Sequence, residues 1–147
     1  MADDHSLNWY TVSNIDSIDS PALLVYEDRV KENIRLLKHI VNDKNRLRPH
    51  VKTNKMAEVC KLLLDAGLTK FKCATIAEAE MLAMLSTPDV LLAYQPVGPK
   101  VLRLIQLIKA YPATHFSSLT DNEASAGYLN EIAGANNMVA DVFIDLN

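Results

Sequence analysis

From Arg48 onward the chain alternates short apolar runs with segments whose apolar residues recur at helical spacing. The apolar runs begin roughly 18 to 25 residues apart with a helical pattern in each interval, which is typical of right-handed βαβ units in a parallel sheet. Solenoid repeats lack this alternation of strands with capped helices. We therefore predict an α/β fold with strands near residues 47–52, 70–74, 89–94, 114–119 and 139–146. Periodicity alone does not decide between an open sheet and a barrel.

Residues that begin and end helices mark the same segments. Thr75-Ile76-Ala77-Glu78 is a capping box, in which the threonine hydroxyl and the glutamate bond the free N–H groups of a new helix. We interpret Glu78 as that cap partner rather than as a general acid. Residues 120–123 form a second box, Gly67 is a helix stop, and Pro99 suits the first position of a helix.

The part of the chain before Arg48 is less regular. Residues 1–19 are polar and mixed, and we expect a loosely attached lead-in segment. Residues 20–26 form a brief apolar run that suits a strand, and Asp28 is a candidate cap for the helix that follows. The apolar face of that helix contains Val30, Ile34, Leu37 and Val41.

The composition excludes several classes of protein. Hydrophobic residues make up 49% of the chain and charged residues 22%, which is ordinary for a soluble globular domain. A net charge of −3 without a basic cluster argues against a nucleic-acid partner. No apolar run reaches membrane-spanning length, and the acidic N-terminus lacks a signal peptide's apolar core, so we expect a cytoplasmic protein without membrane contact. Cys60 and Cys73 form no Cys-x-x-Cys pair, and we expect buried, reduced thiols.

The candidate site centres on Arg48-Pro49-His50-Val51-Lys52-Thr53-Asn54-Lys55, where a short strand gives way to a helix. Lys52 is expected at the carboxyl end of that strand, the edge at which βα folds collect ligands and chemistry. A lysine there is a candidate imine-forming amine. The alternative is a solvated surface charge, which is the usual role of a lysine at a strand end.

The Arg48-Pro49-His50-Val51-Lys52-Thr53 segment resembles the lysine motif of the D-threonine aldolase and D-serine dehydratase family. These are fold-type III enzymes that bind pyridoxal phosphate (PLP) and share an alanine racemase-like barrel. In that family the lysine of Pro-His-x-Lys-Thr forms the Schiff base with the cofactor, and it aligns with Lys52. The family continues Thr-His-Lys where this chain has Thr53-Asn54-Lys55, so no role of that histidine carries over.

Other segments resemble the family in combination. Residues 73–80 are similar to its second strand-to-helix turn, residues 93–98 to its third, and residues 143–147 to a strand that continues into a Gly-Met-x-Arg segment absent from this sequence. The resemblance implies a partial (β/α)8 TIM-type barrel of the alanine racemase kind, with its first five strands and a preceding N-terminal helix. Residues 1–147 would then be the N-terminal portion of a PLP-binding barrel domain.

PLP needs a neutral lysine amine, donors for its phosphate and a group that sets the electronics of its ring. Partial burial and the positive charges of Arg48 and Lys55 are candidate causes of a lowered pKa at Lys52. His50 alternates with Lys52 along the expected strand, so both side chains should point into the barrel, where His50 would orient the ring or pass protons. The alternative for His50 is an interior histidine with satisfied hydrogen bonds. Weaker candidates for the cofactor wall, at the same level, are Thr75, Tyr94 and Gln95; for Thr75 the cap role already explains the residue.

We predict no metal site in this chain. His5, His39 and His115 have no spacing with Asp, Glu or Cys that suggests one. The resemblance implies a divalent metal held near the C-terminus of a much longer chain, and those ligands are not in this sequence. The later strands, whose turns would grip the phosphate, are also missing. We therefore expect poor activity of the isolated chain, and pairing into a homodimer, because a half-barrel leaves sheet edges free.

Two functions are consistent with the sequence. The first is a PLP-dependent lyase acting on small D-amino acids, and the residues do not separate an aldolase from a dehydratase or a racemase. The second is a catalytically incomplete or non-catalytic βα domain that binds a small ligand or a partner chain, which Asn54 and the end of the sequence favour slightly.

Overall fold

The computed structural model describes residues 8–146, so residues 1–7 of the expected lead-in segment and Asn147 lie outside the described part. Within this part the strands form one sheet in the order β1-β2-β3-β4, and every neighbouring pair is parallel. Their bounds are β1 Lys70–Cys73, β2 Asp89–Leu92, β3 His115–Thr120 and β4 Asp141–Ile144. The predicted α/β fold with a parallel sheet is confirmed.

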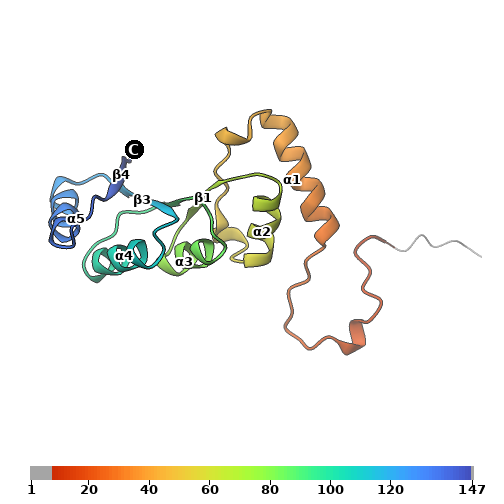
Figure 1. The fold of residues 1–147 in the computed structure, drawn as a ribbon. Coiled ribbons are helices and arrows are strands. Elements are labelled where there is room, and N and C mark those ends of the chain that lie inside the picture. Colours follow the sequence, from red (N-terminus) through yellow and green to blue (C-terminus); the bar gives the residue numbers. More distant parts are fainter. Residues whose placement is uncertain (1–7, 147) are drawn as a thin grey trace, which may run out of the picture.

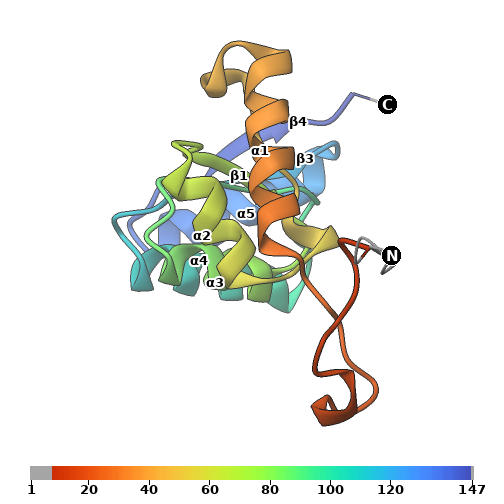
Figure 2. The same cartoon turned by 90° about the vertical axis from the view of Figure 1, so that its right-hand side faces the viewer.

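A helix fills each interval between strands, and two more, α1 Glu27–Val41 and α2 Ala57–Asp65, precede β1. The helices in the intervals are α3 Ile76–Met84, α4 Pro99–Ala110 and α5 Glu123–Ala135. Both views show α3 and α4 on one side of the strands, with α1 at the end of the molecule beside α2 (Figures 1 and 2). None of the described helices is both long and apolar enough to cross a membrane.

The sheet has one covered face and one open face. Phe71 and Val90 are fully buried in a core that also contains residues of α2 and α3. Their neighbours along the strands, Lys72 and Leu91, are only partly buried. Because side chains alternate across a strand, Lys72 and Leu91 lie on the opposite face, which we call the open face. Parallel sheets are covered on both faces in almost all proteins, so this face is unusual.

The strand expected at residues 47–52 is wrong in its extent. Only His50 makes an isolated parallel bridge, with Lys72, and the Pro49 carbonyl accepts a hydrogen bond from the Lys72 N–H at 2.9 Å. Val51–Thr53 is a 3-10 helix, η3. Proline has no N–H for a ladder, and the Lys52 N–H donates to His50 Nδ1 at 3.2 Å instead of to a strand. The first of the five expected strands is therefore reduced to one bridge.

Two expectations about the N-terminal part are also wrong. Residues 20–26 form no strand, and Leu23 is 80% exposed because this segment loops away from the rest of the molecule and has no strand beside it (Figure 1). The N-cap of α1 is Tyr26 without a side-chain cap bond, whereas Asp28 lies in the first turn, where its charge favours the helix dipole. The expected apolar face is present, and Ile34 is its buried residue.

Most of the expected helix boundaries are confirmed. Thr75 Oγ1 accepts a hydrogen bond from the Glu78 N–H at 3.1 Å, and the Glu78 carboxylate accepts one from the Ala74 N–H at 2.8 Å. Gly67 lies just past α2 with a φ of +87°, and Pro99 is the first residue of α4. The second capping box is wrong by two residues. The cap of α5 is Asn122, whose side chain accepts from the Ser125 N–H at 3.1 Å.

Both cysteines are free thiols and buried, so the expected burial is confirmed. Burial raises the pKa of Cys60 to about 11 and that of Cys73 to about 12. Thiolate is the reactive form, so at about pH 8 we expect neither residue to react with iodoacetamide in the folded chain, and both to react after unfolding in urea. Mass spectrometry of the alkylated protein measures this. Rapid alkylation of either cysteine without urea would contradict the buried position.

Candidate functional site

The turn that presents Lys52 follows directly from the bridge between His50 and β1. Val51 is fully buried, and its carbonyl accepts hydrogen bonds from the N–H groups of Asn54 at 3.2 Å and Lys55 at 2.8 Å. Lys52 itself is exposed. The predicted alternation of His50 and Lys52 along a strand is therefore wrong, because Lys52 belongs to the 3-10 turn. The turn is anchored at one buried residue and presents the amine to solvent.

Asn54, which departs from the resembling motif, has a local structural role. Its side chain accepts a hydrogen bond from the Met56 N–H at 3.1 Å, which directs the chain into α2. The next residue, Lys55, has a φ of +51°, in the left-handed region that non-glycine residues seldom adopt. The turn from Val51 to Met56 is thus fixed by two backbone hydrogen bonds to Val51 and by the side-chain bond of Asn54.

Glu78 connects this turn to the start of α3. Its carboxylate is buried, accepts from the Ala74 N–H, and lies 3.4 Å from the Lys55 ammonium. The expected role as a cap partner is confirmed, and the ion pair with Lys55 adds a second role. A buried carboxylate that keeps both a backbone donor and a cation holds the two turns at a fixed separation.

Arg48 does not lie beside Lys52 as a source of positive charge. Its guanidinium makes a bidentate pair with Asp89, at 2.6 and 2.8 Å, and donates to the Phe71 carbonyl at 3.2 Å. Asp89 is the first residue of β2, so this pair lies at the amino ends of the strands. Arg48 and Lys55 are therefore each paired with a carboxylate, so neither is a free positive charge beside Lys52.

His50 is held as a neutral acceptor. Its Nδ1 accepts the Lys52 N–H at 3.2 Å. Burial, and then the nearby ammonium groups of Lys52 and Lys72, lower the pKa of His50 below its usual value, whereas the Glu78 carboxylate and a hydrogen bond with the Lys72 backbone oppose them. A neutral ring with Nδ1 as acceptor carries its proton on Nε2. His50 therefore fixes the backbone of Lys52 and keeps Nε2 as its remaining donor.

The three weaker candidates all follow the carboxyl ends of strands. Thr75 caps α3, so its hydroxyl is already used. Gln95 Oε1 accepts from Thr120 Oγ1 and from the Asp121 N–H, both at 3.0 Å, which ties the loop after β2 to the end of β3. The Tyr94 ring is partly buried, which raises the pKa of its phenol. Of the three, Tyr94 keeps its polar atom free of a hydrogen bond within residues 8–146.

A row of paired charges crosses the open face at the amino ends of the strands. Beyond the Arg48–Asp89 pair, His115 has Nδ1 3.9 Å from Asp89 and Nε2 2.7 Å from Asp141. We call Arg48, Asp89, His115 and Asp141 the amino-end ladder. It connects the segment that contains the His50–Lys72 bridge to β2, β3 and β4, and each of its four residues has a partner.

Lys72 and Asp89 lie on the open face but are not among the site residues that the sequence analysis predicts. For Lys72 the sequence does contain a signal, because Lys70-Phe71-Lys72-Cys73 alternates charged with apolar residues inside an expected strand. Such alternation indicates a strand with one polar face. No group of three or more His, Cys, Asp or Glu side chains in the described chain is placed to hold a metal ion.

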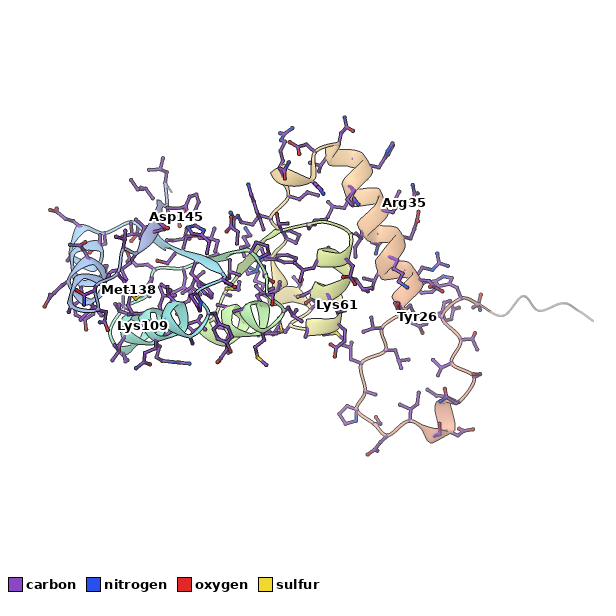
Figure 3. The ribbon with its side chains drawn as sticks, in the orientation of Figure 1. Tyr26, Arg35, Lys61, Lys109, Met138 and Asp145 are labelled. Atoms are coloured by element: carbon purple, nitrogen blue, oxygen red, sulfur yellow. The ribbon has the colours of Figure 1, made fainter. Side chains whose placement is uncertain are left out.

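A hollow of about 510 Å³ lies away from the strand ends, beside the start of α1. It is lined by Trp9, Glu32 and residues 26–29, and the Arg29 guanidinium covers the Trp9 ring at 4.5 Å from its centroid. Figure 3 shows Tyr26 at this end of the molecule, far from Met138 and Asp145. Because its aromatic face is already covered by Arg29, this hollow is not the candidate site.

The family model for the alanine racemase N-terminal domain matches residues 25–147. The chain belongs to this family. Its described strands and helices are similar to the N-terminal portion of the alanine racemase-like barrel, which decides for a barrel-type arrangement over an ordinary open sheet. The resemblance found in the Arg-Pro-His-Val-Lys-Thr motif is thereby confirmed at the level of the family.

Three relatives of this alanine racemase-type chain are informative. D-threo-3-hydroxyaspartate dehydratase of Delftia sp. (strain HT23) is 32% identical over 92 residues, which are 62% of this chain and 24% of that protein. The structure of D-threonine aldolase from Filomicrobium marinum has 26% identity and a TM-score of 0.79, over 88% of this chain and 35% of that one. An Ala racemase-like protein from Idiomarina loihiensis has 31% identity and a TM-score of 0.79, over 90% and 35%. The chain therefore spans between a quarter and about a third of the relatives it matches.

Proposed function

We propose that the chain is the N-terminal portion of a PLP-binding barrel domain in a lyase that acts on small D-amino acids, and that Lys52 bonds to the cofactor. The observation that carries the proposal is the position of Lys52, exposed on a turn that is anchored by buried Val51 at the carboxyl end of the sheet. The names of two relatives, a D-threo-3-hydroxyaspartate dehydratase and a D-threonine aldolase, support the reaction class.

The residues of the turn fit a cofactor that carries an aldehyde. The Lys52 ammonium has no carboxylate partner among residues 8–146, so its amine can be released for a bond to carbon without breaking an ion pair. When bound, PLP supplies an electron sink for the bond that breaks at the substrate's α-carbon. Lys52 would hold the cofactor, and the ring of Tyr94 would form part of its wall.

His50 would fix the orientation of Lys52 through Nδ1 and would hold one proton on Nε2. Because Nδ1 is occupied by the Lys52 N–H, only Nε2 can face a ligand, and in the neutral ring it donates a hydrogen bond. Glu78 would act at a distance, by holding Lys55 and therefore the far side of the turn. Thr75 and Gln95 would shape the rim rather than contact the reacting atoms, since both side chains already bond within the protein.

A cytoplasmic location and a homodimer complete the proposal. β4 is the edge strand of the sheet in the described chain, and its apolar side chains Val142, Phe143 and Ile144 are 43%, 49% and 74% exposed. In the isolated chain an exposed apolar edge of this kind favours pairing with another copy, whereas in a full barrel the next strand would cover it.

The test is reductive labelling. The chain is incubated with PLP, reduced with borohydride, digested and mapped by mass spectrometry, with urea-unfolded chain as the control. We expect about one label per folded chain on the peptide that contains Lys52, and labels spread over many lysines in urea. No label on the folded chain, or the same spread in both samples, would remove the proposal and favour a non-catalytic βα domain.

A further inference from the structure

One row of residues on the open face runs through the candidate site. His50 is bridged to Lys72, and Lys72 is in register with Leu91 of β2. Phe71 and Cys73, on either side of Lys72, are fully buried in the core beneath the sheet. Strand alternation therefore places Lys72 on the open face, beside His50 and just below the turn of Lys52.

The charges of this face are paired at the amino ends but not at Lys72. Every charged member of the amino-end ladder has a partner of opposite sign or a histidine–carboxylate contact. In the described part of the chain, Lys72 pairs with no carboxylate. It is partly buried, and both Lys52 and Lys72 are close enough to lower the pKa of His50. The Glu78 carboxylate also acts on His50 but is paired with Lys55, so Lys52 and Lys72 have no carboxylate of their own, and a bound anion would relieve the cost of their charges.

We propose that Lys72 is an anion-binding residue, whose ammonium takes an oxyanion of a ligand held between the open face and the turn of Lys52. Two oxyanions have this chemistry, the carboxylate of an acidic substrate and the phosphate of the cofactor. The choice of these two ligands rests on the proposed function. The anion site itself rests on the observation that Lys72 has no carboxylate partner in the described part of the chain. Lys70, on the same strand and face, lies at its amino end and serves as the matched comparison.

The first experiment measures anion binding without any cofactor. D-malate, a dicarboxylate without an amine, is titrated into the chain and its variants by calorimetry, with D-lactate as the monocarboxylate comparison. We expect D-malate to bind at least about tenfold more weakly to Lys72→Met than to the wild type, and Lys72→Arg to recover most of the affinity. Lys70→Met should stay within about twofold of the wild type, because Lys70 lies two residues closer to the amino end of β1, about 6.6 Å from Lys72 along the strand, and would not contact a ligand held at the turn of Lys52. Thermal unfolding of each variant shows that the fold is retained.

The second experiment identifies the source of the anion. Borohydride labelling of Lys52 is compared for PLP and for pyridoxal, which lacks the phosphate. If Lys72 binds the cofactor's phosphate, Lys72→Met lowers labelling by PLP and not by pyridoxal. If it binds a substrate carboxylate, D-malate binding is lost and both labels are unchanged. Either pattern supports the anion site.

One result overturns the inference. Equal D-malate affinity in the wild type and Lys72→Met, together with unchanged labelling by PLP, leaves Lys72 without a role in anion binding. Failure of the proposed function is a separate result. In that case Lys52 takes no label in the wild type, while loss of D-malate binding in Lys72→Met still identifies the anion site.

Discussion

Replacing Lys52 with arginine is expected to abolish covalent attachment of PLP while the chain stays folded. The guanidinium remains protonated at every pH compatible with folding and does not attack an aldehyde, so labelling after borohydride reduction should fall by at least about 100-fold. The fold should be unaffected because the Lys52 side chain is exposed and makes no ion pair within residues 8–146. Intact mass after reduction measures the label, and thermal unfolding checks the fold.

Lys55→Arg is the matched control for this variant. Lys55 lies on the same turn and is also exposed, and arginine keeps the positive charge near Glu78. Labelling at Lys52 should therefore be close to that of the wild type. If Lys52→Arg still carries a single label on another residue of the turn, the amine that serves the cofactor has been misassigned, and Lys55 becomes the first alternative.

The sequence predicts the later strands of the sheet better than the first. Strands β1, β2 and β4 form inside their expected ranges and β3 ends one residue beyond its range, because an apolar run and a neighbouring helical pattern agree at every one of them. At residues 47–52 the run contains Pro49, and His50 draws the following N–H away from the sheet. Residues 20–26 fail for another reason. An apolar run becomes a strand only where a neighbouring strand accepts its hydrogen bonds, and none lies beside this segment.

The sequence predicts those features of the site that depend on residues close to one another in the chain. The place of Lys52 near a strand end and the cap role of Glu78 follow from short motifs. Arg48 is close to Lys52 in sequence, but an extended chain rises about 3.3 Å per residue, so Arg48 lies at the amino ends of the strands whereas Lys52 lies toward their carboxyl ends. Its partner Asp89 is 41 residues away. Such pairs depend on the register between strands, which no local pattern gives.

Phe71→Ala is expected to cost about 3–5 kcal/mol of the free energy of unfolding, a large part of the roughly 5–15 kcal/mol of a typical domain. Phe71 is fully buried, lies opposite Val90 in the β1–β2 pair, and packs in the core shared with α2 and α3. Truncation removes the ring and leaves a cavity that the surrounding strands and helices cannot close. Urea unfolding followed by circular dichroism measures the loss.

Phe143→Ala provides the comparison, because it deletes the same ring from a different position. Phe143 lies on β4, is in register with Leu119, and is 49% exposed. We expect it to cost about 1 kcal/mol or less. Equal losses for the two variants would contradict the one-sided core, because a ring that costs as much at the sheet edge must be covered. If the loss at Phe143 also grows with protein concentration, the covering surface is a second copy of the chain, since association stabilises the folded state by mass action.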